Sequence, residues 1–332
     1  MIRRPAVVTG LLLATLLAGC GYEATPVPGP PEASSPPAPA PAPECTSDVD
    51  PLASYPPSDE VVGKVAEIRD RGRLVVGVSA DTYRMAAFDP FSGRIEGFDI
   101  EFAKRVAAEI FGPTFSPGAN LQLRVITAAE RIPALQEGEV DLVVRNMTIN
   151  CDRWTDVAFS SVYYAATQKV LVSEELADGD DTTNGEYDSP ADLAGLRVCA
   201  PTGSTSLVNI TDAEPEAIIE PASTHTGCLV KFQQGEVDAI TGDDTVLAGL
   251  AAQDPYAVVP DQEPFSNEPY GIAAKSQDVE LVQFVNAVLE EMRADGSWQA
   301  AYDRWLAPRL GPADPALNPP TPNYDRPVSW TP

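Results

Sequence analysis

The sequence is poor in histidine and in basic residues. Its 332 residues include a single histidine, His225, and only 22 Lys and Arg against 49 Asp and Glu. A single imidazole excludes any mechanism that needs two, such as a His-rich zinc site. The net charge of −27 argues against a nucleic-acid partner, because phosphate binding needs clustered Lys and Arg that displace counterions. This composition does not exclude catalysis by carboxylates.

The apolar run at the N-terminus is too short to span a bilayer, which takes about 20 apolar residues. Two arginines precede the run at 5–18, as in an export signal. Cys20 directly follows Leu-Ala-Gly and resembles the bacterial lipobox, in which the thiol is acylated and becomes the new N-terminus. The alternative is a plain secretory signal with Cys20 discarded. We expect residues 1–20 to be a lipoprotein signal peptide, with the protein lipid-anchored on the extracytoplasmic face of the cell membrane.

Proline is concentrated at the two ends of the chain. Nine of the eighteen residues at 26–43 are proline, so residues 21–59 should form an extended, semi-stiff tether. The tail at 311–332 is also Pro-rich and shows no helix or strand periodicity, so it should lie on the surface or be disordered. The length left between the two corresponds to about two domains.

The cysteines contain no C-x-x-C pair, which argues against a redox or zinc role, and we expect neither a metal nor a cofactor. Four remain after export: Cys45, Cys151, Cys199 and Cys228. In an oxidising compartment they suggest two disulfides, with three possible connectivities. We favour Cys199 with Cys228, because one lies on a predicted strand and the other opens a predicted helix in the same half. That leaves Cys45 with Cys151.

The folded region contains an internal repeat of short segments. Residues 136–142 and 233–239 both contain Gly-Glu-Val-Asp after an apolar helical stretch, with Gly where a helix C-cap needs a left-handed residue. The segments 72–76 and 195–199 both have the apolar character of buried parallel strands. Apolar residues at helical spacing predict a helix over 98–111. Strand, helix and strand in the same order twice predict two α/β lobes of similar plan.

In open α/β sheets, ligands bind beyond the carboxyl ends of the strands. Arg153 follows the first repeat and could hold a carboxylate bidentately, or it could be a surface arginine paired with a neighbouring Asp. Ser204 and Thr205 follow the second predicted strand and could cradle a carboxylate at a helix start, or only cap that helix. Asp243 follows the second repeat and could accept an ammonium group, or cap the next helix. Together these residues would form an α-amino-acid site.

A set of short motifs over residues 60–310 resembles one known family. The motifs are, in chain order, Gly72-Arg73-Leu74, Gly97-Phe98-Asp99, the segment 131–135, the segment 138–141, the segment 148–153, Phe159-Ser160, Tyr163-Tyr164, Asp238-Ala239, Asp243-Asp244, Glu268-Pro269-Tyr270-Gly271 and Asp295-Gly296-Ser297 before Trp298 and Trp305. As a set they resemble extracellular solute-binding proteins of the polar amino-acid type (family 3), in particular actinobacterial lipoproteins that bind glutamate, glutamine and aspartate.

The resemblance implies a two-lobed periplasmic-binding-protein fold of type II, in which each lobe is a sheet flanked by helices. Lobe 1 would comprise residues 60–165 and 267–310, and lobe 2 residues 166–266. The chain would cross between the lobes near 165–169 and 261–267. Two such hinge segments suit closure around a ligand.

The resemblance also implies roles for individual residues. Asn146 would offer its backbone oxygen to the ligand ammonium, and Thr148 would donate to the ligand carboxylate. Arg153 would hold that carboxylate, and Asp243 would hold the ammonium. Thr205, with its neighbour Ser204, would supply the backbone N–H wall of the second lobe.

The loop after the first strand departs from the family pattern, which often places an aromatic ring over the ligand there. Tyr83 could stack in its place. Arg84 could meet a side-chain carboxylate and so favour glutamate or aspartate over glutamine, or it could point to solvent.

The function implied is that of a monomeric binding protein without enzymatic activity. It would clamp an amino acid and deliver it to an ABC permease or report it to a membrane sensor. An alternative is a dehydratase-like enzyme on the same scaffold, with Glu130 as the only candidate acid. Glu130 could instead complement a helix dipole. A structural cell-wall module would have no cleft, and Arg153 and Asp243 argue against it.

Overall fold

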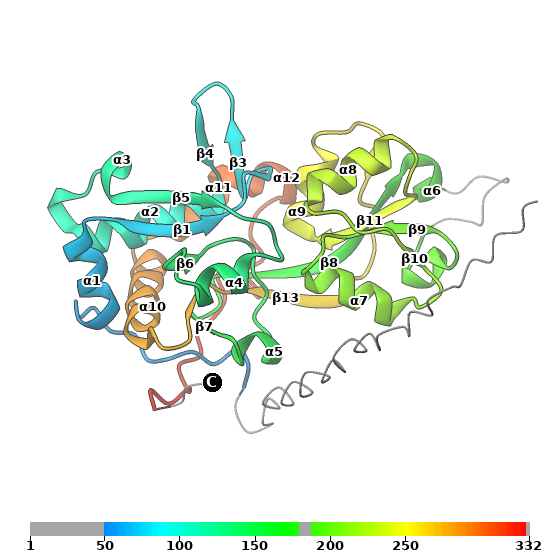
Figure 1. Cartoon of the computed structure of the whole chain (residues 1–332). Coiled ribbons are helices and arrows are strands. Elements are labelled where there is room, and N and C mark those ends of the chain that lie inside the picture. The colour runs from blue at the N-terminus through cyan, green and yellow to red at the C-terminus, as the bar shows by residue number, and fades with distance from the viewer. Residues whose placement is uncertain (1–49, 179–186, 330–332) are drawn as a thin grey trace, which may run out of the picture. The chain divides into compact units, whose positions relative to one another are not determined.

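The structure, a computed structural model, describes residues 50–178 and 187–329, which belong to one compact unit (Figure 1). The signal peptide predicted at 1–20 with Cys20, most of the predicted tether, and Cys45 lie outside the described residues and stay predictions. Within the two described ranges, no helix has both the length and the apolar character needed to cross a bilayer.

Two sheets of the same plan organise the described chain. The first has the order β5 (Leu121–Val125), β1 (Leu74–Val78), β6 (Leu142–Val143), β14 (Ala273–Lys275), β7 (Val157–Phe159). The second has the order β10 (Ile218–Ile219), β9 (Arg197–Cys199), β11 (Ala239–Asp243), β8 (Tyr164–Ser173), β12 (Ala257–Val258), and β13 (Ser266–Tyr270) also pairs with β8. In each sheet three neighbouring strands are parallel and the fourth is antiparallel. We call the parts built on these sheets the first and second lobes, and the predicted pair of α/β lobes is confirmed.

Helices pack against each sheet (Figure 1). Those on the first sheet are α2 (Phe98–Phe111), α3 (Pro117–Asn120), α4 (Arg131–Gln136), α5 (Cys151–Trp154) and α10 (Val279–Ala294). Helices α1 (Gly63–Arg71) and α11 (Ser297–Trp305) pack on α2 and α10, and α12 (Ala307–Leu310) contacts α11 and α9. In the second lobe the helices are α6 (Glu174–Asp178), α7 (Thr205–Ala213), α8 (His225–Gln233) and α9 (Asp244–Ala251). A small sheet of β2 (Asp81–Thr82), β3 (Ala86–Asp89) and β4 (Arg94–Glu96) follows β1. Helix α2 has the bounds that its apolar spacing predicts.

The repeated Gly-Glu-Val-Asp segments have a structural reason. Gly138 and Gly235 adopt φ values of 72° and 69°, the left-handed conformation predicted after α4 and α8. The carboxylate of Asp141 accepts a hydrogen bond from the backbone N–H of Val75 at 2.9 Å, next to the start of β1. The carboxylate of Asp238 accepts one from the backbone N–H of Arg197 at 2.8 Å, at the start of β9. The repeat therefore fixes the register of two neighbouring parallel strands in each lobe.

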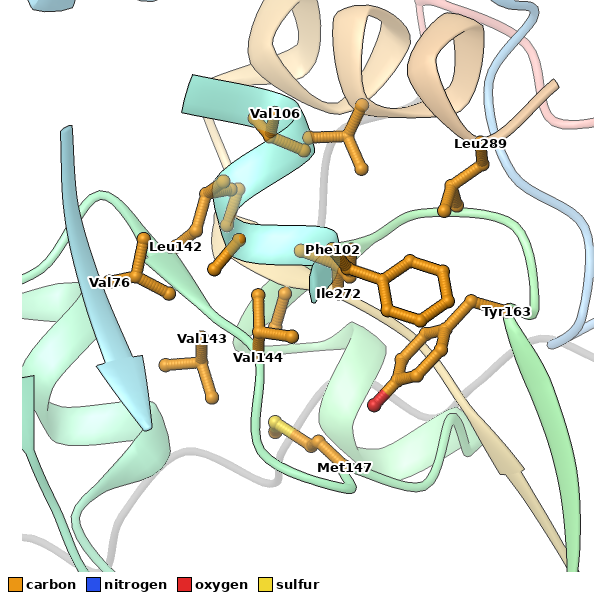
Figure 2. Close-up of a cluster of buried hydrophobic side chains, with 14 of the residues drawn as sticks. Val76, Phe102, Val106, Leu142, Val143, Val144, Met147, Tyr163, Ile272 and Leu289 are labelled. Atoms are coloured by element: carbon orange, nitrogen blue, oxygen red, sulfur yellow. The ribbon is translucent and has the colours of Figure 1, made fainter. Parts of the chain in front are cut away.

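The core of the first lobe lies between its sheet and helices α2 and α10, as Figure 2 shows. Phe102 and Val106 of α2 are fully buried, which confirms the predicted apolar stripe. The ring of Phe102 lies beside Tyr163, with 4.8 Å between the ring centroids, and Val76 of β1, Leu142 of β6 and Leu289 of α10 belong to the same buried cluster. This packing holds the carboxyl ends of β1 and β6 in place, and the loops that follow these strands are therefore positioned by a rigid layer.

The strands β8 and β13 run antiparallel beside each other, with Tyr164 opposite Tyr270 and Gln168 opposite Ser266. Ser160 and Tyr163, just before β8, hydrogen-bond to the backbone beside β14 and at the end of β13, which ties this pair of strands to the first lobe. Two extended segments therefore pass side by side between the lobes. The particular boundaries predicted at 165/166 and 266/267 stay a prediction.

The described part of the Pro-rich tail is anchored by single side chains. Asn318 accepts a hydrogen bond from the backbone N–H of Ala165 at 2.9 Å and donates to the carbonyl of Ala165 at 3.1 Å. Arg326 is 2% exposed and places its guanidinium carbon 3.6 Å from the ring centroid of Trp154. The tail therefore lies against the first lobe and the start of β8. Its composition did not predict these anchors, because each depends on one residue.

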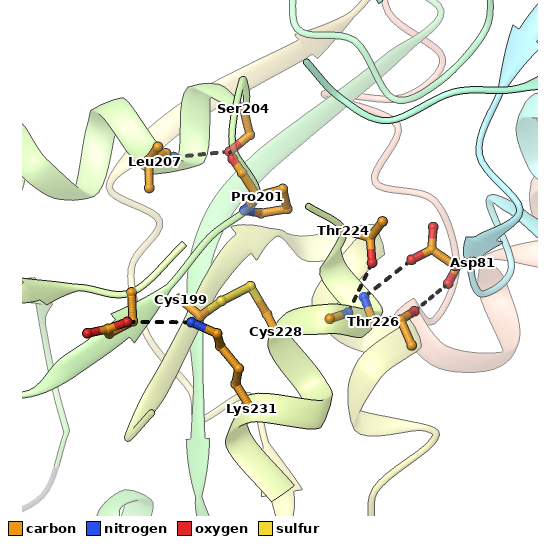
Figure 3. The surroundings of a disulfide bond; sticks show 11 residues. Asp81, Cys199, Pro201, Ser204, Leu207, Thr224, Thr226, Cys228 and Lys231 are labelled. Atoms are coloured by element: carbon orange, nitrogen blue, oxygen red, sulfur yellow. Dashed lines mark hydrogen bonds and ion pairs between the residues drawn. A yellow bond between two sulfur atoms is a disulfide. The ribbon is translucent and has the colours of Figure 1, made fainter. Parts of the chain in front are cut away.

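The predicted disulfide between Cys199 and Cys228 is confirmed (Figure 3). Cys199 ends β9 and Cys228 lies in the first turns of α8, with 5.5 Å between their Cα atoms. Both residues are fully buried, so the bond ties α8 to the second sheet from within the core. Because Cys45 lies outside the described residues, the pairing of Cys45 with Cys151 stays a prediction.

Removing this disulfide should destabilise the second lobe. The bond closes a loop with a sequence separation of 29, for which the chain-entropy model gives about 3–4 kcal/mol. Cys199→Ala combined with Cys228→Ala should lower the free energy of unfolding by about that amount in urea denaturation. Cys199→Ala alone also breaks the bond and should cost nearly as much. A loss below about 1 kcal/mol would show that the crosslink contributes little.

Candidate functional site

Arg153 lies in α5, beyond the carboxyl end of β6. Asn150 caps this helix by accepting a hydrogen bond from the backbone N–H of Arg153 at 2.9 Å. The guanidinium is largely buried, with the residue 9% exposed, and Nη1 donates to the carbonyl of Thr148 at 2.6 Å. Nη2 donates to the carbonyl of Gly203 in the second lobe at 3.4 Å. Arg153 is therefore not a surface arginine paired with a neighbouring Asp.

Asp243 ends β11 and is 4% exposed. Its Oδ2 accepts a hydrogen bond from the hydroxyl of Tyr270 at 2.6 Å. Asp243 stands at the N-cap position of helix α9, but its side chain makes no capping hydrogen bond. Its Oδ1 is buried without a hydrogen-bond partner in the described part of the chain. Burial, reinforced by the negative charges of Glu268 and Asp244, raises the pKa of Asp243 to about 8, against opposing effects of Tyr270 and Arg131.

Arg153 and Asp243 would each be stabilised by a ligand group of opposite charge. Burial lowers the pKa of Arg153, and the charges of Glu268 and Asp243 oppose that shift. A buried charge without sufficient partners is costly, so a ligand that brings the opposite charge is favoured. A carboxylate at Arg153 and an ammonium at Oδ1 of Asp243 would meet both needs. The arrangement therefore suits a small zwitterion.

The predicted hydroxyl residues meet at the same place from opposite lobes. The hydroxyl oxygens of Thr148 and Thr205 are 3.1 Å apart, and both hydroxyls donate to Oε2 of Glu268. Ser204 is the N-cap of α7, and its hydroxyl accepts from the backbone N–H of Leu207 at 3.2 Å. Ser204 therefore caps its own helix, while Thr205 directs its side chain into the cluster.

Asn146 has a φ of 33°, in the left-handed region that Asn tolerates better than most residues. Its backbone N–H donates to the carboxylate of Asp99 at 3.0 Å. Its carbonyl accepts from Nη1 of Arg131 at 3.3 Å, and its side-chain Oδ1 is buried without a hydrogen-bond partner in the ranges described. Asp99 is fully buried, and burial raises its pKa to about 6. The unusual backbone conformation turns the residue toward the region where the lobes meet.

Sequence reasoning assigned no role to Arg131, which belongs to this cluster. It is 3% exposed, and its Nη2 donates to the carbonyl of Gly203 at 3.0 Å. Burial and the charge of Arg153 lower its pKa well below the ordinary value, while Asp243 opposes the shift. One sequence signal was available, because Arg131 starts helix α4, where a cation opposes the helix dipole.

Glu268 was also missed as a site residue, although it stands in one of the quoted motifs. It lies in β13 and is 1% exposed. A carboxylate inside a strand that pairs across the hinge is a signal for a specific partner, since Glu is rarely buried alone. Within the described ranges, no group of three or more His, Cys, Asp or Glu is placed to hold a metal ion.

Tyr83 and Arg84 lie elsewhere, between β2 and β3. They line a separate hollow of about 410 Å³ with Phe88, Phe91 and Trp305. None of the other six predicted ligand residues lines this hollow. The guanidinium carbon of Arg84 is 5.2 Å from the ring centroid of Tyr83. The structure thus brings six of the eight predicted ligand residues to one region and leaves these two apart, and their predicted contact with a ligand stays a prediction.

The two lobes also touch at points outside the cluster of Arg153, Asp243, Thr148 and Thr205. The hydroxyl of Thr226 in α8 donates to the carbonyl of Asp81 in β2 at 3.0 Å (Figure 3). The turn at Gly203 approaches Ala129 so closely that an added Cβ would lie 2.7 Å from the Cα of Ala129. At Gly203 the two lobes therefore meet backbone to backbone, with no room for a side chain on this residue.

Two α/β lobes, linked by a pair of extended strands and holding a buried arginine and a buried aspartic acid where they meet, define a two-lobed binding protein of type II. The chain belongs to the bacterial extracellular solute-binding proteins, family 3, whose sequence model matches residues 74–308. It is accordingly an extracytoplasmic protein of the solute-binding class.

Similar proteins agree with this assignment. The chain is 35% identical over 244 residues to the ABC transporter glutamine-binding protein GlnH of Bacillus subtilis (strain 168), covering 73% of this chain and 84% of GlnH. It is 32% identical over 247 residues to the glutamate-binding protein GluB of Corynebacterium efficiens, covering 73% and 80%. The crystal structure of the ancestral amino acid-binding protein AncCDT-1, a precursor of cyclohexadienyl dehydratase, matches with 32% identity and a TM-score of 0.64, covering 73% of this chain and 99% of AncCDT-1.

Proposed function

We propose that this protein binds polar amino acids, with glutamine, glutamate and aspartate as the ligand class. The observation that carries the proposal is the pair Arg153 and Asp243, which are buried in opposite lobes, with Oδ1 of Asp243 lacking a hydrogen-bond partner in the described residues. The similarity to proteins named for glutamine and glutamate binding supports the same class.

In this proposal the two charged ends of the ligand are held separately. The α-carboxylate is bound by Arg153, by the hydroxyl of Thr148 and by the N–H groups at the start of α7, including that of Thr205. The α-ammonium is bound by Oδ1 of Asp243 and the carbonyl of Asn146. Each charged hydrogen bond contributes about 1.5–3 kcal/mol. Because the donors come from both lobes, binding favours closure about β8 and β13.

The ligand-bound protein is then recognised by a membrane partner, either an ABC permease or a membrane sensor. The similarity to an ABC transporter binding protein supports a permease. The lipobox motif at Cys20 supports a lipid anchor, with the Pro-rich tether spacing a monomeric two-lobed domain from the membrane.

The protein is proposed to bind without chemical conversion. Similarity to a precursor of a dehydratase makes an enzyme the second candidate, which needs an acid with a proton to transfer. The carboxylate of Glu130 accepts a hydrogen bond from the backbone N–H of Thr127 at 2.6 Å, and this bond lowers its pKa. Glu130 is therefore ionised at neutral pH and a poor general acid. Turnover of an arogenate-like substrate would favour the enzyme.

Calorimetry of the purified protein tests the proposal. Glutamine, glutamate, aspartate and arginine are titrated separately, and binding heat is expected for at least one of the first three. Absence of both binding heat and a thermal shift with all four would remove the proposal. Binding of arginine alone would replace the ligand class while leaving the two-lobed mechanism in place.

Gly203→Ala should weaken the binding of the amino acid that calorimetry identifies. The added methyl group would overlap the backbone of Ala129 only when the lobes are closed, and overpacking costs about 1–3 kcal/mol, or roughly 5- to 150-fold in Kd. Gly235→Ala is the matched control, because Gly235 has a similar φ of 69° and open space around its Cβ position. If both variants bind as the wild type does, Gly203 does not limit closure.

A further inference from the structure

Glu268 makes an unusually complete set of hydrogen bonds. Its Oε2 accepts from the hydroxyls of Thr148 at 2.5 Å and Thr205 at 2.6 Å. Its Oε1 accepts from Nδ2 of Asn209 at 2.7 Å and lies 2.7 Å from the hydroxyl of Ser266, whose single proton is shared with Oε1 of Gln168 at 3.0 Å. With the residue 1% exposed, these donors stabilise a carboxylate that is removed from water.

The donors come from both lobes. Thr148 follows β6 of the first lobe, whereas Thr205 and Asn209 lie in α7 of the second. Glu268 itself lies in β13, one of the two strands that pass between the lobes. Its carboxylate is therefore a bridge at the hinge, and its bonds to Thr148 and Thr205 hold only while the lobes are close together.

The hydroxyl of Thr148 cannot donate a hydrogen bond to two carboxylates at once. A threonine hydroxyl has one proton to donate, and Thr148 donates it to Glu268. In the proposed function, Thr148 donates to the ligand carboxylate. Since Glu268 presents the same chemical group as the α-carboxylate of an amino acid, ligand binding requires Thr148 to change its acceptor.

We propose that Glu268 is a tethered competitor of the ligand carboxylate. It bridges the lobes through Thr148 and Thr205 and sets ligand affinity, because its bond to Thr148 is given up when the ligand binds. This inference rests on the proposed function and deepens it, since it assigns an affinity-determining residue to the same site.

The negative charge of Glu268 also acts on Arg153 and on Asp243. It stabilises the guanidinium of Arg153 in place of a ligand carboxylate. It also raises the pKa of Asp243 and so disfavours the ionised form that accepts an ammonium. Both effects have the same sign as the competition for Thr148: they lower affinity for a zwitterion.

The test is Glu268→Gln in the full protein, with glutamine and glutamate titrated by calorimetry. We expect at least a tenfold lower Kd for the amino acid that the wild type binds, because Arg153 and Thr148 are no longer engaged by a second carboxylate. The gain should shrink at least threefold in a Thr148→Val background. Glu263→Gln, at an exposed position on the same connecting segment, is the control and should leave Kd unchanged.

Two results would overturn the inference. A Kd raised tenfold in Glu268→Gln would show that Glu268 binds the ligand ammonium directly. An unchanged Kd would show that Glu268 and the ligand carboxylate do not compete for the hydroxyl of Thr148. If Glu268→Gln does not fold, Glu268→Asp keeps the charge but withdraws the carboxylate from Thr148 by one methylene, so Kd should fall severalfold, whereas an unchanged value again contradicts the inference.

Failure of the proposed function would look different. If the wild type binds no amino acid, small-angle scattering of the ligand-free protein still tests the bridge. Glu268→Gln should then increase the radius of gyration relative to the wild type and to Glu263→Gln. Equal radii for all three proteins would show that Glu268 does not hold the lobes together.

Discussion

Arg153→Ala should abolish measurable binding of the amino acid that the wild type binds in calorimetry. The substitution removes the only group proposed to hold the ligand carboxylate through a bidentate fork, in a place where the guanidinium is largely excluded from water. Truncating one partner of a buried charge pair costs about 2–5 kcal/mol, which corresponds to roughly 30-fold to several-thousand-fold in Kd.

Two further variants make this result specific. Arg153→Lys keeps the charge but loses the planar fork, so its affinity should fall between those of the wild type and Arg153→Ala. Arg73→Ala changes an exposed arginine of the same lobe and should leave Kd unchanged. Affinity of Arg153→Ala within a few fold of the wild type would show that the carboxylate is anchored elsewhere.

Asp243→Asn should have opposite effects on binding and on stability. Loss of the carboxylate leaves the ligand ammonium without its charged partner, and we expect Kd to rise by roughly 30-fold or more. Without ligand, the same substitution removes a carboxylate that is costly to ionise in the folded state, so the melting temperature should rise.

The stability gain should depend on pH in a defined direction. The carboxyl group of Asp243 ionises near pH 4 in the unfolded chain, but its pKa is about 8 in the folded protein. Between these values the folded state binds one more proton, so the free energy of unfolding of the wild type falls as pH rises. The amide side chain introduced by the substitution does not titrate, so the advantage of Asp243→Asn should grow from pH 4 to pH 8 and then level off.

Thermal melts of the ligand-free proteins at pH 5, 7 and 9 measure this difference. The charged groups that act on Asp243, namely Glu268, Asp244 and Arg131, are present in both proteins, so their own titration largely cancels. Asp254→Asn, at another buried carboxylate of the second lobe, is a useful comparison. A difference between wild type and Asp243→Asn that is constant across pH would contradict the high pKa.

Much of the fold could be predicted because its signals are local. The helix over 98–111 has its apolar residues on one stripe, and Gly138 and Gly235 stand where only a left-handed residue ends the helix well. Cys199 and Cys228 were paired because one lies on a predicted strand and the other opens a predicted helix in the same half of the chain. Each of these inferences uses residues that lie within a few turns of one another or within one supersecondary unit.

The candidate site could be predicted only in part. Asp243 is the last residue of a buried strand, and Arg153 lies in the short helix that follows the segment after β6, so both belong to the region beyond the carboxyl ends of parallel strands. Arg131 and Glu268 do not lie at such a position, and the contacts that bring them into the site come from distant residues: Glu268 meets Thr148 at a separation of 120 residues, and Arg131 meets Gly203 at a separation of 72. Tyr83 and Arg84 follow a strand too, but the turn at Arg84, with φ of 72°, directs them to another hollow.

The repeated segments, the helix periodicity and the strand termini predicted two α/β lobes, because these signals lie among neighbouring residues. The class of protein followed from the resemblance of the motif set to a known family. Which charged groups share one buried space depends on how the distant parts of the chain pack together. The pKa of Asp243, the bridge at Glu268 and the anchoring of the tail by Arg326 all arise from groups brought together by closure of the chain on itself. Desolvation and hydrogen bonding depend on that proximity, and proximity across a fold is not a local property of the sequence.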